Sequence, residues 1–296
     1  CPLYNLGCIP KDTKVPELPE VETMKRGISE VVGGKIASVI FPPCKLQPIS
    51  VAPNHSTFRR RLKGRTIRGL GRLGKRVLVH LSGDFTLIFE PRMTGLVLVA
   101  SPPNLSHLRL KILLEDCEAQ ELLFWDRRGL GSVKCYSASE FQQVYEQGQL
   151  GPDALVVTAE ELETRLKRSR RAIKVALLDQ KQVAGIGNLY ASEILHLARI
   201  HPETPCAALT RQRWVKLQQC IVEVLEEAIR YEGSTLSDGT YRNALNQAGN
   251  YQNAHRVYDR AGSTCPTCER SEIVRTVLAQ RSTFFCPRCQ RSMTRG

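Results

Sequence analysis

The chain has 296 residues, and 42% of them are hydrophobic, which is enough for two or three domains with separate cores. No apolar run approaches the length of a membrane span, and the first fifteen residues lack the apolar centre of a secretory signal. A net charge of +13, from 42 basic and 29 acidic residues, favours a polyanionic partner, most simply nucleic acid.

The N-terminal part is predicted to begin with a helix. Pro19 suits the first position of a helix that runs to Val32. Glu20 lies in its first turn, where the helix dipole favours a negative charge, and the pair Gly33 and Gly34 ends it.

From residue 35 to about residue 137 the pattern indicates β-strands. The clearest candidates are 86–89, 108–112 and 122–125, because their apolar side chains alternate with polar ones or belong to β-forming types. Several strands in succession predict an antiparallel sandwich or barrel.

After about residue 140 the pattern becomes helical. Polar residues that can cap a helix stand in front of amphipathic segments at Thr158, Asn188 and Thr210. Residues 233–262, rich in Gly, Asn, Ser and Gln, are predicted to be loop with short structure.

Four of the 11 cysteines form a metal-binding pattern near the C-terminus. The spacing is C-x2-C-x17-C-x2-C, from Cys265, Cys268, Cys286 and Cys289. Four thiolates complete a tetrahedral zinc site with no open position, so the ion is predicted to be structural. Two disulfides or free thiols are the alternative. The other seven cysteines are scattered and odd in number, which favours a reducing cytoplasmic location over a secreted disulfide scaffold.

Two groups of cations are candidates for phosphate binding. Between the cysteine pairs, 273–277 and 282–285 are predicted to be the strands of a hairpin with Arg281 at or near its turn, where a guanidinium is well placed to grip phosphate. From Phe58 to Arg76, nine residues are Arg or Lys and none is acidic. This clustering favours a nucleic-acid partner over charge that serves solubility alone.

Three separated segments resemble one known family. PELPEVET (16–23) resembles the mature N-terminus of the formamidopyrimidine-DNA glycosylases, GIGNLYASE (185–193) their helix–two-turn–helix signature, and QRSTFFC (280–286) their zinc-finger signature. Order and spacing match over essentially residues 16–290. The resemblance implies a bifunctional enzyme that excises oxidised purines from double-stranded DNA and cleaves the strand at the abasic site.

The resemblance also implies an α+β multidomain architecture, with DNA crossing a cleft between the domains. The expected parts are a leader absent from the mature protein (1–15), an antiparallel β-sandwich with flanking helices (16–138), a helix–two-turn–helix domain (139–262), a zinc finger (263–290) and a tail (291–296). We expect a monomer that holds one structural Zn²⁺.

By the same resemblance, Pro16 is the nucleophile. Its secondary amine would attack the sugar C1′ of a flipped nucleotide and form an iminium, which permits strand cleavage by β,δ-elimination. Glu17 is the implied general acid for the sugar ring oxygen, and Glu20 is a second carboxylate near the nucleophile. Lys75 matches a catalytic-site lysine that contacts phosphate.

A further set of residues is implied to contact DNA. Asn188 and Arg281 match residues that hold the phosphates beside the lesion. Met93 and Arg128 match residues that fill the space left by the flipped base. Tyr251 is a candidate contact in the loop that covers the base.

Two positions depart from the family pattern. The third space-filling residue is an aromatic in the family and Leu130 here; leucine still acts as an apolar wedge but stacks less well. Glu90 stands where better-known members carry a phosphate-contacting histidine. A carboxylate there would repel phosphate unless it is paired, and Arg92 is a candidate partner.

The position of Pro16 within the chain conflicts with its implied role. It follows Val15, so its nitrogen belongs to an amide and is not nucleophilic. We expect translation to initiate at Val15, with removal of the initiator methionine exposing Pro16. Proteolytic maturation and a catalytically inactive relative are the second and third explanations.

Two functions of other classes remain open at this point. A non-catalytic binder of damaged DNA would keep the basic cleft and the zinc finger without a free amine, and would form no covalent imine with DNA. A zinc-ribbon partner of RNA or ribosomes would account for the charge, but it leaves the three family-like segments unexplained.

Overall fold

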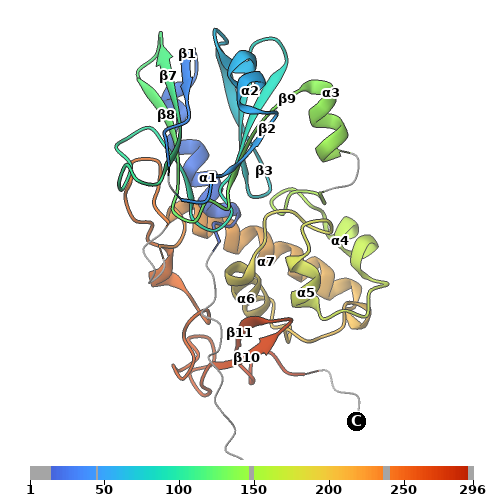
Figure 1. The fold of residues 1–296 in the computed structure, drawn as a ribbon. Helices are drawn as coiled ribbons and strands as arrows, with labels where there is room; N and C mark the ends of the chain where they lie inside the picture. The colour runs from blue at the N-terminus through green and yellow to red at the C-terminus, as the bar shows by residue number, and fades with distance from the viewer. Residues whose placement is uncertain (1–14, 45, 147–149, 236–240, 293–296) are drawn as a thin grey trace, which may run out of the picture.

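The computed structural model describes residues 15–44, 46–146, 150–235 and 241–292. Figure 1 shows a two-sheet β-sandwich at the top, a group of helices below it and a small β-hairpin at the bottom. Within the described ranges no helix is long and apolar enough to cross a membrane.

Two sheets form the sandwich. One has the strand order β1-β7-β8-β6, with bounds Lys35–Ile40, Leu108–Glu115, Glu121–Asp126 and Gly95–Leu98. The other has the order β2-β9-β5-β4-β3, with bounds Ser50–Ala52, Ser132–Ser137, Phe85–Glu90, Arg76–Leu81 and Ile67–Leu73. The predicted sandwich and all three strand candidates are confirmed. The short β2 is a correction to the antiparallel expectation, because it pairs in parallel with β9.

One helix interrupts the region that was predicted to be β-rich throughout. It is α2, His55–Leu62, and the side chain of Asn54 caps it by accepting a hydrogen bond from the Thr57 N–H at 3.0 Å. Phe58 and Leu62 turn into the sandwich core, so this helix closes one end of it. The start of the basic run therefore lies on a helix and not on a strand.

Helix α1, Leu18–Gly27, joins the two main cores. Leu18 packs into the core of the helical domain, whereas Val21 and Met24 pack into the core between the sheets. The helix ends five residues before the predicted Val32 and continues as a single 3₁₀ turn, η1, Ser29–Val31. Because α1 belongs to both cores, the residues in front of it are fixed at the domain junction.

The helical domain contains α4 to α7 and two short helical turns, with bounds Ala159–Leu166 (α4), Ile173–Leu178 (α5), Asn188–Leu197 (α6), Cys206–Ala208 (η3), Arg211–Arg230 (α7) and Tyr251–Ala254 (η4). Helix α3, Ala138–Phe141, and the turn η2, Gln142–Glu146, lie beside the sandwich instead (Figure 1), where Tyr145 packs with Leu78 and Ile88 of the second sheet. Thr158 and Thr210 cap α4 and α7 as predicted. Asn188 does not cap α6, because Gly187 is the cap residue and Asn188 is the first residue of the helix.

The C-terminal hairpin consists of β10, Val274–Leu278, and β11, Arg281–Phe285. The strands pair up to Leu278 and Arg281, and the two residues between them both have positive φ angles, which suits the twist of a two-residue hairpin. Phe284 packs into the core of the helical domain. The finger is therefore docked on that domain and holds Arg281 at its tip.

Candidate active site

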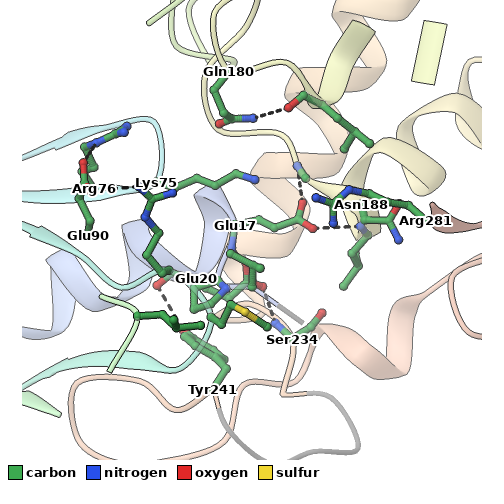
Figure 2. A pocket seen from close by; sticks show the side chains of 18 of the residues that line it. Glu17, Glu20, Lys75, Arg76, Glu90, Gln180, Asn188, Ser234, Tyr241 and Arg281 are labelled. Carbon is green, nitrogen blue, oxygen red and sulfur yellow. Dashed lines mark hydrogen bonds and ion pairs between the residues drawn. The ribbon is translucent and has the colours of Figure 1, made fainter. Parts of the chain in front are cut away.

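A cavity of about 560 Å³ lies where the three parts of the molecule meet. Figure 2 shows Lys75 extending from one side towards Glu17, with Asn188 and Arg281 on the other side. Eight of the ten residues predicted to act in catalysis or DNA contact line this cavity: Pro16, Glu17, Glu20, Lys75, Met93, Leu130, Asn188 and Arg281.

The carboxylate of Glu17 stands at the N-terminal end of α6. It accepts hydrogen bonds from the backbone N–H groups of Gly187 at 2.6 Å, Leu189 at 2.9 Å and Tyr190 at 3.4 Å. The first N–H groups of a helix have no partner within the helix, so Glu17 takes the place of a local cap. A Cβ atom at position 187 would lie 2.3 Å from the Glu17 Cδ atom, so this close approach requires glycine.

Burial controls the protonation of Glu17. Removal from water raises the pKa of Glu17 from its ordinary 4.5 to about 7. The Lys75 ammonium group and the N–H groups of Leu189 and Tyr190 work in the opposite direction, and the charge of Glu20 adds to the rise. A carboxyl group in this range is present in both protonation states near neutral pH, as a general acid requires.

Glu20 is a second buried carboxyl group on the cavity floor. It accepts hydrogen bonds from the Tyr190 hydroxyl at 2.6 Å, the Ser234 N–H at 2.9 Å and the Glu17 N–H at 2.9 Å. Burial raises the pKa of Glu20, against the effect of these donors. Because both domains supply donors, this carboxyl group is fixed in orientation.

The turn between β3 and β4 carries Lys75 and is tied to both domains through Arg72. The guanidinium of Arg72 donates to Asp153 of the helical domain, at 2.9 Å for one of two hydrogen bonds, and to Glu22 of α1 at 3.1 Å. Asp153 also accepts from the Gly74 N–H at 3.2 Å. Burial lowers the pKa of Lys75, although the two nearby carboxyl groups oppose that shift.

Arg281 and Asn188 come together because the zinc-finger hairpin is bonded to the helical domain. The buried Lys174 donates to the Ser282 carbonyl oxygen at 3.0 Å and to the Thr283 hydroxyl at 2.8 Å. The Asn188 amide also donates to the Ser282 carbonyl at 3.0 Å. This hydrogen bond joins the first residue of α6 to the hairpin.

A buried carboxylate shapes the two turns that carry the predicted space-filling residues. Asp126 accepts hydrogen bonds from the Thr94 hydroxyl, from the Arg128 N–H at 3.1 Å and from the Gly131 N–H at 2.7 Å. One side chain thus sets both the turn after Met93 and the loop 127–131. The sequence did not single out Asp126.

Four of the residues predicted to contact DNA differ in their exposure and in whether they line the cavity. Met93 is half-buried and Leu130 is 39% exposed, and both line the cavity. Arg128 is exposed but does not line it. The expected contact at Tyr251 is corrected, because this side chain is fully buried in the helical core with its ring 5.7 Å from that of Tyr190. The loop expected to cover the base, 237–253, lies partly outside the described residues.

Glu90 lines the cavity and is paired more strongly than the sequence indicated. It accepts hydrogen bonds from Arg76 Nε and, at 2.9 Å, from the Ser132 hydroxyl. The predicted partner Arg92 is present but more distant, at 3.7 Å. Burial alone would raise the pKa of Glu90, but the cations Arg76 and Lys134 outweigh it and hold this pKa at about 2.

Sequence reasoning also missed Gln180. Its side chain donates to the Ile186 carbonyl oxygen at 2.8 Å and accepts from the Gly185 N–H at 2.9 Å, so it shapes the turn in front of α6. It lines the cavity as well. Nothing in the local sequence marks it except its place before the GIG segment.

The four predicted zinc ligands lie together, with their Sγ atoms all within 4.8 Å of one another. The separations are 3.9 Å for Cys265–Cys289 and 3.7 Å for Cys268–Cys286. Zn–S bonds of about 2.3 Å imply sulfur–sulfur edges of roughly 3.8 Å in a tetrahedron. These distances fit a four-thiolate zinc site and are too long for disulfides.

Together, the sandwich, the helical domain and the four-cysteine finger, closing on a pocket with two buried carboxyl groups, define a DNA glycosylase of the helix–two-turn–helix class. Family models agree: the formamidopyrimidine-DNA glycosylase N-terminal domain matches residues 15–133, its H2TH domain 150–240, and the zinc finger found in FPG and IleRS 262–291.

Known proteins of similar sequence and structure identify the family. The formamidopyrimidine-DNA glycosylase of Chloroflexus aurantiacus is 40% identical over 282 residues, covering 94% of this chain and 99% of the relative. The Fpg crystal structure from Thermus thermophilus has 35% identity and a TM-score of 0.80, covering 93% and 98% of the two chains. Lactococcus lactis Fpg in complex with DNA that contains an abasic site has 33% identity and a TM-score of 0.82, covering 93% and 100%. The chain belongs to the formamidopyrimidine-DNA glycosylase family.

Proposed function

We propose that this protein excises oxidised purines, such as 8-oxoguanine and formamidopyrimidines, from double-stranded DNA and then cleaves the strand at the abasic site. The observation that carries the proposal is the position of Pro16 on the cavity floor beside Glu17, whose carboxyl pKa is about 7. A solved complex of a Lactococcus lactis Fpg mutant with DNA containing Fapy-dG, at 33% identity and a TM-score of 0.82, supports this substrate class.

The reaction begins with a flipped nucleotide in the cavity. The Pro16 nitrogen, as a free amine, forms a bond to C1′ and gives up its N–H proton, while the bond from C1′ to the base breaks and the base leaves with that electron pair and takes up a proton. Glu17 donates a proton to the ring oxygen O4′, so the sugar opens and the nitrogen–carbon bond becomes an iminium.

The iminium then accepts electrons from C2′. Loss of a proton from C2′ expels the 3′ phosphate, and a second elimination expels the 5′ phosphate. Lys75, Asn188 and Arg281 hold the neighbouring phosphates during these steps, while Glu20 keeps the start of α1 in place. The zinc ion takes no part in the chemistry, because four thiolates leave it no open position.

The active form has Pro16 as its first residue, and the segment 1–15 is absent from it. In the full chain the Pro16 nitrogen is an amide and cannot react. This enzyme would act as a monomer with one structural zinc ion, on chromosomal DNA in the cytoplasm.

A second candidate function is a non-catalytic binder of damaged DNA. Val15 favours it, because this residue lines the cavity and blocks the nucleophile in the full chain. The pocket and the phosphate-facing cations would then recognise a flipped nucleotide without reacting with it.

Borohydride trapping separates the two functions. Protein that begins at Pro16 and the full chain are each incubated with duplex DNA containing 8-oxoguanine opposite cytosine, and the reduced covalent adduct is measured. We expect an adduct only with the Pro16 start. If neither protein gives an adduct while both fold and bind the lesion duplex, the non-catalytic binder replaces the enzyme.

A further inference from the structure

Glu90 is the centre of a cluster of cations at one side of the cavity. Arg76 donates to it through Nε, Lys134 lies 3.4 Å from it and Arg92 lies 3.7 Å from it. Three cations surround one carboxylate, so the cluster keeps an excess of positive charge. The negative charge of Glu90 therefore does not make this side of the cavity repel phosphate.

The guanidinium of Arg76 is the best placed of these cations to meet a ligand. Among the described residues its one hydrogen-bond acceptor is Glu90, which engages Nε and leaves both terminal nitrogens for another partner. The ring of Tyr145 lies against it, 5.3 Å from the guanidinium carbon. Arg76 also lines the cavity and follows Lys75 directly in the chain.

The sheet explains why Glu90 holds this side chain. Strands β4 and β5 are antiparallel, and Val77 pairs with Phe89. Arg76 and Glu90 are therefore opposite each other at the end of this pair, where it meets the cavity. Glu90 is 4% exposed and is also bonded by Ser132, so it is a rigid support for the guanidinium.

We propose that Arg76, held in place by Glu90, is an additional phosphate-binding residue for the DNA strand that enters the cavity. Glu90 is a positioning residue, and its effect on DNA affinity is favourable although its charge is negative. The inference rests on the proposed function in that it takes DNA as the ligand, but it concerns binding and does not require a free Pro16 amine.

The sign of one substitution tests the proposal. Glu90→Gln removes a negative charge near DNA, so simple electrostatics predicts tighter binding. We expect the opposite: roughly three- to tenfold weaker binding to a duplex that carries a tetrahydrofuran abasic-site analogue, because Arg76 loses its support. Affinity is measured by fluorescence anisotropy over a range of salt concentrations.

A double-mutant cycle with Arg76→Met assigns the effect to the pair. Arg76→Met alone is expected to weaken binding about tenfold and to reduce the slope of log Kd against log salt by about one. In the Arg76→Met background, Glu90→Gln is expected to tighten binding, since only its charge effect remains. The charge-matched control is Glu121→Gln, which removes a carboxylate at the opposite end of β8 from Asp126, and it should leave affinity unchanged.

Thermal unfolding of each variant shows whether it is folded. If Glu90→Gln does not fold, Arg76→Lys decides, because it keeps the charge and loses the planar fork. Weaker binding by Arg76→Lys supports the proposal, and unchanged binding overturns it.

The inference and the proposed function fail in different ways. Tighter or unchanged binding by folded Glu90→Gln, in a protein that still prefers the abasic-analogue duplex over undamaged duplex, overturns the role of Glu90 alone. A wild-type protein without that preference overturns the proposed function, and this inference with it.

Discussion

Two buried carboxyl groups in the same cavity have opposite protonation behaviour. Glu17, on the floor, accepts hydrogen bonds from backbone N–H groups and has one nearby cation, Lys75, and one nearby carboxyl group, Glu20; burial prevails and raises its pKa to about 7. Glu90, at the side, is surrounded by cations that hold its pKa at about 2. Both are almost fully buried, at 5% and 4% exposure, so burial alone does not explain the difference.

The difference lies in what compensates the lost water. At Glu17 the one nearby cation, Lys75, and the backbone donors do not offset desolvation, because the neighbouring Glu20 charge adds to the rise. At Glu90 a hydrogen-bonded guanidinium and a second cation, Lys134, do offset it. The floor is thereby suited to proton transfer, whereas the side keeps a fixed charge near neutral pH. This comparison predicts different consequences for equivalent substitutions in the two regions.

The largest expected effect follows from Glu17→Gln in protein that begins at Pro16. Glutamine cannot donate the proton to O4′, so we expect base excision to slow by about 10²- to 10⁴-fold. In wild type, excision should fall as pH rises through about 7, because the acid is then ionised. The variant should lack that alkaline limb. Both are measured as single-turnover rates on 8-oxoguanine duplex.

Two readouts show whether Glu17→Gln acts through the acid. Affinity for the abasic-analogue duplex should be unchanged, and borohydride trapping on preformed abasic DNA should persist, since an open-chain aldehyde needs no proton on the ring oxygen. A wild-type pH profile that stays flat from about 6 to about 9 would contradict the role of Glu17 as acid.

Stability should depend on pH in opposite directions at the two carboxyl groups. The folded pKa of Glu90 is depressed, so its contribution is present above the ordinary value of 4.5 and is lost as pH falls towards 2. From about pH 5 to about pH 3 the stability advantage of wild type over Glu90→Gln should shrink by about 2 kcal/mol.

At Glu17 the sign reverses, because the folded protein binds the proton more tightly than the unfolded chain does. As pH rises from 4.5 to about 7, wild type should lose roughly 3 kcal/mol relative to Glu17→Gln. Urea unfolding at each pH measures both differences. If the stability difference from wild type changed with pH in the same direction for Glu17→Gln and Glu90→Gln, the contrast between the floor and the side of the cavity would be wrong.

Removing zinc should affect the DNA-facing side of the cavity and spare the floor. Without the ion the hairpin loses its fold, and Arg281 is no longer held beside Asn188. We expect Cys286→Ser, or chelation of the wild-type protein, to weaken binding of the abasic-analogue duplex by roughly tenfold or more. Zinc content is measured alongside by atomic absorption. Retained affinity in zinc-free protein would contradict this dependence.

The parts of the site that the sequence predicted depend on local spacing. The cysteine pairs define a zinc site by their separation, and the PELPEVET segment places Pro16, Glu17 and Glu20 at one helix start. The strand candidates were right because alternation and the share of β-forming residue types are also local properties. None of these conclusions required knowing how distant segments meet.

What the sequence did not predict depends on tertiary contacts. Glu17 caps α6, which is far from it in the chain, so the local prediction of Asn188 as cap was wrong. Tyr251 is a core residue whose ring lies beside those of Tyr190 in α6 and Tyr231 at the end of α7, which no local pattern shows. The Arg76–Glu90 pair depends on the register of β4 and β5, in which the three-residue loop 82–84 joins the paired residues Leu81 and Phe85.

The smallest expected effect concerns Leu130, which extends the comparison to the apolar part of the cavity. It is 39% exposed and lines the cavity, held in a loop that Asp126 shapes, so a larger side chain there has room. Leu130→Phe should tighten binding of the abasic-analogue duplex about threefold, because an aromatic ring stacks on bases better than an aliphatic side chain does. Neither the salt dependence of binding nor the pH profile of excision should change, since no charge is altered.

The gain is measured by fluorescence anisotropy with each of the four bases opposite the analogue. The matched control is Leu105→Phe, at an exposed leucine outside the cavity lining. A gain that depends on the opposite base would identify residue 130 as the one that reads that base, whereas equal affinity in both proteins would show that Leu130 does not enter the duplex.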